Sequence, residues 1–114
     1  MALNGKYLEE AERLLKSGDY VQASEKFWGA VAEMVKVVAT HRRWRHYSHN
    51  ELRSAVEKLY KETGDRELLT LFSVAEALHA NLYENFMSGE VVEAHADDAL
   101  RLVAKLQSLA TCLH

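Results

Sequence analysis

The chain has 114 residues, of which 48% are hydrophobic and 27% are charged, and its formal net charge is −3 at pH 7. This length fits one domain, and the composition is that of a globular chain rather than a disordered one. The net negative charge excludes a protein that coats nucleic acids over its whole surface. Any attraction for RNA or phosphate must therefore be local.

Three features predict a cytoplasmic protein with no membrane association. No apolar run approaches the ~18 residues of a membrane span, and the opening MALNGKYLEE lacks the apolar centre of a signal peptide. Cys112 is the single cysteine, so no disulfide can form within one chain, which favours a reducing compartment. We expect Cys112 to be a small apolar residue on the last helix.

Helix breakers are scarce, which predicts an all-α fold. The sequence has no proline and only five, isolated glycines. Apolar residues recur at helical spacing, and no stretch keeps the alternation of a strand. The expected helices cover about residues 4–17, 19–39, 48–63, 65–86 and 90–109. Short turns between them force neighbours to run antiparallel, so we expect an up-and-down bundle of five helices in a single domain, residues 1–114.

The first two predicted helices form an amphipathic hairpin. Gly18 suits the left-handed position that ends the first helix, and Asp19 with Gln22 resembles a capping box at the start of the second. Trp28 falls beside the apolar stripe of the second helix rather than on it. That stripe comprises Ala23, Phe27, Ala30, Val31, Met34, Val35 and Val38.

The remaining three helices have equally clear boundaries. Ser48 and Glu51 have the spacing of a second capping box, Gly64 ends the third helix, and Asp65 can cap the fourth. Ser88 and Gly89 form the break before the fifth. The residues expected to face inward are Leu68, Leu71, Phe72, Ala75, Leu78, Leu82, Tyr83 and Phe86 on the fourth helix, and Val91, Ala99, Leu102, Val103, Leu106 and Leu109 on the fifth.

Two stretches carry a family resemblance. Residues 18–39, GDYVQASEKFWGAVAEMVKVVA, resemble the second helix of HEPN domains, the higher eukaryote and prokaryote nucleotide-binding domains. Residues 79–106, HANLYENFMSGEVVEAHADDALRLVAKL, resemble the last two helices of the same group, with its His-x-Asn-x-Tyr-Glu run. The resemblance covers about residues 4–108 and is closest to the archaeal PaREP-type branch.

This resemblance implies a helical bundle that is usually a homodimer or is paired with a nucleotidyltransferase partner. It also implies one of two roles. Many HEPN domains are metal-independent ribonucleases with an arginine, four to six further residues and then a histidine. Others lack this motif and serve as binding or toxin–antitoxin components. We expect the second role, a non-catalytic interaction module linked to nucleic-acid or nucleotide metabolism, with the ribonuclease and a purely structural dimer as alternatives.

The basic segment, residues 40–52 (THRRWRHYSHNEL), contains three arginines and three histidines. Five residues separate Arg43 from His49, and six separate Arg42 from His49, so both pairs fit the ribonuclease spacing. Histidine can move a proton near neutral pH, and arginine can hold the charge of a phosphorane. The catalytic alternative therefore assigns Arg43 (or Arg42) and His49.

Two non-catalytic interpretations of the basic segment stay open. Its bases can simply offset the negative end of the second helix. Alternatively, the segment can bind RNA or a nucleotide, with Trp44 and Tyr47 stacking on bases while Arg42, Arg43 and Arg45 hold phosphates.

A second group of polar residues lies late in the fourth predicted helix. His79 and Tyr83 share a face, Glu76 is adjacent to His79, and Asn85 follows. They predict a possible pocket of His79, Tyr83 and Asn85, or a structural hydrogen-bond network. In an assembled dimer, His79 could face the basic segment.

No cofactor or metal is expected. His79, Glu76, His95 and Asp98 could approach one another, but no predicted helix carries two histidines at metal-binding spacing. No glycine-rich phosphate loop is present. Trp28, Val37 and Leu69 lie outside the apolar faces assigned to their helices. Apolar residues at such positions favour a second buried face and hence a homodimer.

Overall fold

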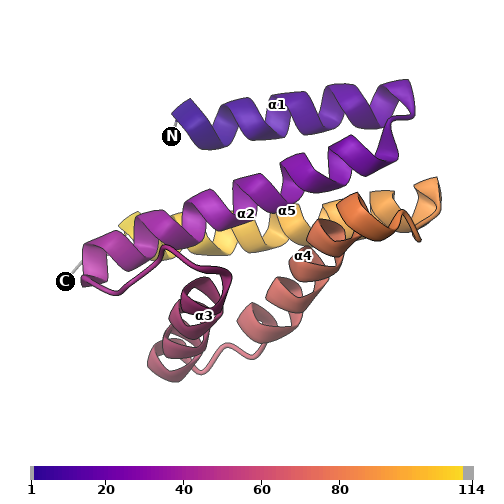
Figure 1. Ribbon diagram of the computed structural model, residues 1–114. Coiled ribbons are helices and arrows are strands. Elements are labelled where there is room, and N and C mark those ends of the chain that lie inside the picture. The colour runs from indigo at the N-terminus through magenta and orange to yellow at the C-terminus, as the bar shows by residue number, and fades with distance from the viewer. Residues whose placement is uncertain (1, 112–114) are drawn as a thin grey trace.

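The computed structural model describes residues 2–111 as five helices joined by short turns (Figure 1). The helices are α1 (Ala2–Ser17), α2 (Tyr20–Arg42), α3 (His49–Thr63), α4 (Glu67–Glu84) and α5 (Gly89–Thr111). No residue of this described range lies in a strand, which confirms the all-α prediction. Cys112 lies outside the described residues.

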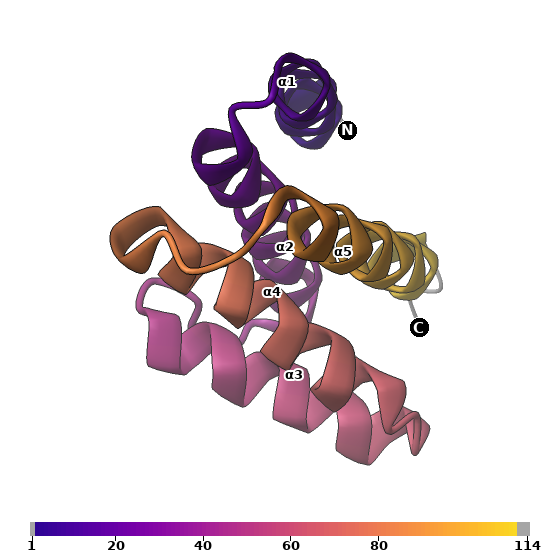
Figure 2. The same cartoon turned by 90° about the vertical axis from the view of Figure 1, so that its right-hand side faces the viewer.

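α2 lies at the centre of the bundle. It packs against each of the other four helices, whereas the main contact of α1 is with α2 alone. Figure 2 shows α1 on one side of α2 and the α3–α4 hairpin on the other, with α5 alongside. Consecutive helices run antiparallel in the α1–α2, α3–α4 and α4–α5 pairs, and the α3–α4 hairpin is inclined to the long axis of α2 and α5 (Figure 1).

The central place of α2 follows from its sequence. Small residues (Ala23, Ala30 and Ala39) alternate along it with large apolar ones, so neighbouring helices can approach it from several sides. Trp28 belongs to this core and is 7% exposed, so the prediction that it lies off the core and favours a partner contact was wrong. The buried face of α2 is broader than the single stripe drawn from the sequence.

Most helix ends follow the expected caps, but the start of α4 does not. Its N-cap is Arg66, which makes no side-chain capping hydrogen bond, and Asp65 Oδ1 instead accepts from the Glu67 N–H at 3.1 Å. Ser48 and Glu51 form the predicted capping box, and Gly18 and Gly64 have positive φ values of 84° and 74°. α2 continues to Arg42, beyond the predicted end near residue 39, because nothing in residues 40–42 breaks a helix. It ends where Arg43 takes a left-handed conformation with φ 64°.

The end of α4 differs from the prediction in which side chains face inward. Asn85 takes a left-handed conformation and ends α4 at Glu84, so Phe86 lies in the following turn and is 57% exposed. Tyr83 is 75% exposed and Val91 is 40% exposed, although both were expected to be buried. Asn81 is buried in their place, and Val92 takes the inward position on α5.

Asn81 is buried because its side chain replaces missing backbone hydrogen bonds. Its Oδ1 accepts hydrogen bonds from the backbone N–H groups of Phe86 (2.9 Å) and Met87 (3.0 Å). Its Nδ2 donates to Ser24 Oγ at 3.0 Å, and Ser24 Oγ in turn donates to the Tyr20 carbonyl at 2.7 Å. This network fastens the α4–α5 turn to the first turns of α2.

Replacing Asn81 by alanine should therefore destabilise the whole bundle. The substitution removes three hydrogen bonds and leaves buried N–H groups without an acceptor, which should lower the free energy of unfolding by about 3 kcal/mol. Urea denaturation followed by circular dichroism measures this loss. Asn85→Gly is the matched control, because Asn85 is exposed and glycine accepts the left-handed conformation, so its effect should stay within about 0.5 kcal/mol. Equal losses in the two variants would contradict the role assigned to Asn81.

Candidate functional site

The first half of the basic segment fastens α2 to α3. Arg42 Nε donates to both carboxylate oxygens of Glu62, at 3.2 and 3.0 Å. The Trp44 ring lies against two cations, with Arg42 Cζ 5.7 Å and Lys58 Nζ 5.2 Å from its centroid. The Arg42 guanidinium and the Trp44 ring thus already have partners within the chain.

The second half of the segment is more exposed. Tyr47 is 82% exposed, and the Arg45 side chain is 85% exposed although its Nε lies 2.9 Å from Glu51 Oε2. Arg43 is also exposed, and no hydrogen bond or ion pair holds its side chain within residues 5–111. The exposed arginines and Tyr47 therefore remain available to a ligand.

Glu51 organises the turn that leads into α3. Its Oε1 accepts hydrogen bonds from the backbone N–H groups of Tyr47 (2.9 Å) and Ser48 (3.1 Å). These donors, Tyr47 first, lower the pKa of the Glu51 carboxyl below its usual value, and Arg45 acts in the same direction. The turn thus fixes the backbone that presents Tyr47 and His49.

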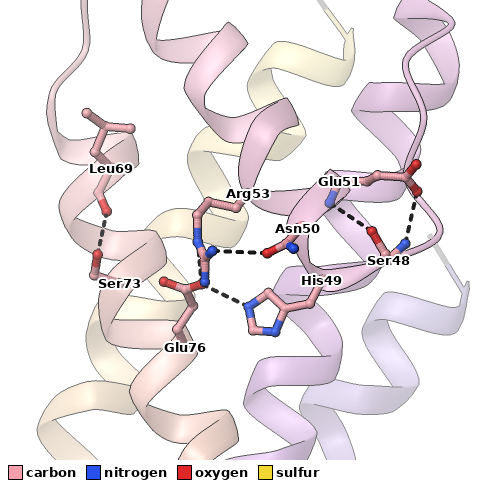
Figure 3. Close-up of polar contacts among 8 residues, drawn as sticks. All are labelled: Ser48, His49, Asn50, Glu51, Arg53, Leu69, Ser73 and Glu76. Carbon is pink, nitrogen blue, oxygen red and sulfur yellow. Dashed lines mark hydrogen bonds and ion pairs between the residues drawn. The ribbon is translucent and has the colours of Figure 1, made fainter.

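His49, the first residue of α3, shares an acceptor with an arginine one turn later (Figure 3). Its Nε2 lies 2.8 Å from Glu76 Oε2, and Arg53 donates to the same oxygen from Nη2 at 2.6 Å and Nε at 3.0 Å. Arg53 Nη1 also donates to Asn50 Oδ1 at 3.2 Å. The Glu76 carboxylate on α4 thus holds two cationic or potentially cationic groups of α3.

A second histidine–glutamate pair lies beside the first. His79 Nδ1 on α4 is 2.9 Å from Glu25 Oε1 on α2. The His79 ring stacks on Trp28, with centroids 4.9 Å apart, and the His49 ring lies 5.1 Å from the same indole. The two imidazole centroids are 5.8 Å apart. We call this cluster the histidine face; it consists of Glu25, Trp28, His49, Arg53, Glu76 and His79.

The carboxylates orient both imidazoles. A carboxylate can only accept, so His49 donates from Nε2 and His79 donates from Nδ1. The opposite nitrogens, His49 Nδ1 and His79 Nε2, have no hydrogen bond within the described residues. Such pairing fixes the tautomer and makes the second nitrogen a proton acceptor, as in other carboxylate–histidine pairs. Both side chains are partly exposed, at 39% for His49 and 26% for His79.

Sequence reasoning found some of these residues and missed others. His49 and His79 were both singled out, and His79 was placed near the basic segment in an assembled dimer, whereas the two rings meet within one chain. Arg53 and Glu25 were missed, although Glu25 and Trp28 have the helical spacing that puts two side chains on one face. The structure brings Arg53, rather than Arg43, to the carboxylate that holds His49.

The predicted pocket of His79, Tyr83 and Asn85 is not assembled as one unit. Tyr83 meets the His79 ring edge-on, with centroids 5.7 Å apart, but its side chain points largely to solvent. Asn85 is the left-handed cap of α4. Within residues 5–111, no group of three or more histidine, cysteine, aspartate or glutamate side chains is arranged to hold a metal ion.

Comparisons with known proteins bear on the family and the fold. The model of the archaeal PaREP1/PaREP8 family matches residues 1–103. This chain belongs to that family. No curated protein matches the sequence. A Sulfolobus solfataricus protein of known crystal structure is similar, with 24% identity, a TM-score of 0.83, and coverage of 93% of this chain and 94% of that one. The likeness shows that this PaREP1/PaREP8-family chain shares the fold of that protein.

None of the described helices has the length and hydropathy to cross a membrane.

The lowered pKa of Glu51 predicts how the turn before α3 responds to acid. A carboxyl group whose pKa is lower in the folded state stabilises the fold above its unfolded pKa of about 4.3, and this contribution disappears as the pH falls through the folded value. Glu51→Gln keeps the capping hydrogen bonds but removes the charge. We expect a lower melting temperature than wild type at pH 7 and a difference that narrows as the pH falls below the usual pKa of a glutamate.

Thermal unfolding of both proteins from pH 7 to pH 3 measures this effect. Glu12→Gln serves as the control, because Glu12 is exposed on α1 and has no hydrogen bond or ion pair within residues 5–111. A difference between wild type and Glu51→Gln that stays constant with pH would show that the charge of Glu51 does not stabilise the turn.

Proposed function

We propose that this chain is a helical module that binds single-stranded RNA through the histidine face and the turn beside it. The observation that carries the proposal is the placement of two exposed tyrosines at the two histidines. Tyr83 contacts the His79 ring, and Tyr47 lies two residues before His49. The resemblance to HEPN domains supports a role in nucleic-acid or nucleotide metabolism.

The chemistry of the surface fits a single strand better than a duplex. Unpaired bases stack on exposed aromatic side chains, whereas the bases of a duplex are already stacked. Tyr47 and Tyr83 are the two most exposed large hydrophobic residues among residues 5–111. Arg43, Arg45 and Arg53 lie in or next to the same turn and have exposed side chains that can contact phosphates.

The number of exposed cations limits the electrostatic part of binding. The Arg42 side chain is held by Glu62 and is only 18% exposed, against 85% for Arg45 and 48% for Arg53, so Arg42 is not counted among the phosphate contacts. Three phosphate contacts, from Arg43, Arg45 and Arg53, remain. Binding should therefore depend on salt less steeply than in proteins that neutralise many phosphates.

A salt titration tests this proposal. Fluorescence anisotropy with a labelled oligouridylate should give a logarithmic plot of affinity against salt with a slope of about −2, since each single-strand phosphate contact contributes about −0.7. Arg43→Ala should reduce the magnitude of the slope by about 0.7. Arg13→Ala, an exposed arginine on α1, is the control and should leave the slope unchanged. Absence of binding at 50 mM salt by the folded protein would overturn the proposal.

Ribonuclease activity is a second candidate function, favoured by the two carboxylate-oriented imidazoles. In this scheme one open imidazole nitrogen accepts the proton of a ribose 2′-hydroxyl, and the 2′-oxygen attacks the adjacent phosphorus. The bond from phosphorus to the 5′-oxygen breaks, and the other, protonated imidazole gives its proton to that leaving oxygen. The products are a 2′,3′-cyclic phosphate and a free 5′-hydroxyl. The two remaining N–H groups of Arg53 can hold the charge on the phosphoryl oxygens.

A cleavage assay in EDTA separates binding from catalysis. The ribonuclease scheme predicts 2′,3′-cyclic phosphate ends with wild type, and a loss of at least about 100-fold with His49→Ala or His79→Ala. His95→Ala is the matched control, because His95 lies on α5 and bonds to the Val91 carbonyl of its own helix. Loss with His49→Ala but not with His79→Ala would instead favour the original pairing of His49 with Arg43. Binding without any cleavage would make the chain a binding module alone.

The partners implied by the HEPN resemblance stay predictions. A homodimer or a nucleotidyltransferase partner would need an exposed apolar surface. Phe86 and Val91, at 57% and 40% exposed, lie on either side of the start of α5 and are the candidates for such a contact.

A further inference from the structure

A groove of about 280 Å³ lies between α3 and α4, directly beside the histidine face. Arg53 and Glu76 belong to both, so the groove continues the surface proposed to bind RNA. Three apolar side chains line it: Val56, Leu69 and Phe72. The remaining lining residues are polar, and more of them can accept a hydrogen bond than can donate one.

Three of the polar groups in the groove can accept hydrogen bonds. Glu57 is exposed, and within residues 5–111 its carboxylate has no hydrogen bond or ion pair. Glu76 uses Oε2 for all its bonds to His49 and Arg53, which leaves Oε1 open. Ser73 Oγ donates its hydrogen to the Leu69 carbonyl at 3.2 Å, so that oxygen can only accept from a ligand (Figure 3).

One group in the groove can donate. Arg53 has five N–H groups, and its bonds to Glu76 and Asn50 use three of them. Two N–H groups, one on each terminal nitrogen, remain. The groove thus combines an open carboxylate, two further acceptors and a forked donor around an apolar lining.

We propose that this groove is a subsite for a guanine base of the bound RNA. Guanine is the one common RNA base with two adjacent donors, N1–H and N2–H, on one edge and two adjacent acceptors, O6 and N7, on another. The Glu57 carboxylate pairs with the two donors, and one free N–H group of Arg53 pairs with an acceptor, which leaves its other free N–H group for a phosphate. Adenine and cytosine each place an acceptor next to their amino group, which would face a carboxylate oxygen.

This subsite rests on the proposed RNA-binding function, because it places a guanine next to His49. It can still be tested without RNA. Isothermal titration calorimetry with the 5′-monophosphates of guanosine, adenosine, cytidine and uridine compares the four bases with one phosphate each. The expected result is that guanosine monophosphate binds at least about tenfold more tightly than the other three.

Glu57→Gln tests the carboxylate directly. The amide keeps one acceptor but loses the second, so binding of guanosine monophosphate should weaken about tenfold while the other nucleotides change little. Glu93→Gln on α5 removes the same charge outside the groove and should leave all four affinities unchanged. Circular dichroism of each variant confirms that it is folded.

The outcomes separate this inference from the RNA-binding proposal. Equal affinities for the four nucleotides, or an unchanged guanosine monophosphate affinity in Glu57→Gln, would overturn the guanine subsite. If oligouridylate still bound with the expected salt slope, the RNA-binding face would stand without it. A guanosine preference that Glu57→Gln removes, in a protein that does not bind oligouridylate, would support the groove as a nucleotide site and overturn the RNA-binding function.

Discussion

The burial of α2 on several sides is the constraint on which the rest of the structure depends. Each other helix is positioned by packing on α2, and α1 has few contacts beyond it. The histidine face is a direct result, because Trp28 of α2 provides the apolar surface on which the rings of His49 and His79 rest. Without the α2 core, α3 and α4 would have no common surface against which to align these rings.

Charge pairing explains why so basic a segment can lie in an acidic chain. Glu62 binds Arg42, Glu51 binds Arg45, and Glu76 binds both His49 and Arg53. Each pair is partly exposed, so each adds little to stability. Their main effect is geometric: they fix the directions of side chains that would otherwise move freely, and fixed groups lose less entropy when a ligand binds.

The sequence predicted the helices well because their signals are local. Ser48 with Glu51 and the glycines at helix ends specify boundaries through nearby backbone groups alone. It failed at Asn81 and Tyr83 because the burial of an asparagine depends on hydrogen-bond partners that the helical pattern does not reveal. Here the donors are the N–H groups of a turn that forms only once Asn85 has left the helical conformation.

The histidine face could be predicted only in part, for a related reason. His49 is 30 residues from His79, and their meeting depends on the inclination of the α3–α4 hairpin across α2, which no local pattern encodes. The spacing of Arg43 and His49 drew attention to a histidine of this face but to an arginine whose side chain makes no hydrogen bond or ion pair within residues 5–111. Arg53 lies four residues after His49 on the same helix, and neighbours at this spacing share a face. In a helical protein, the partner of a candidate residue is therefore better sought one turn along its own helix than in the turn that precedes the helix.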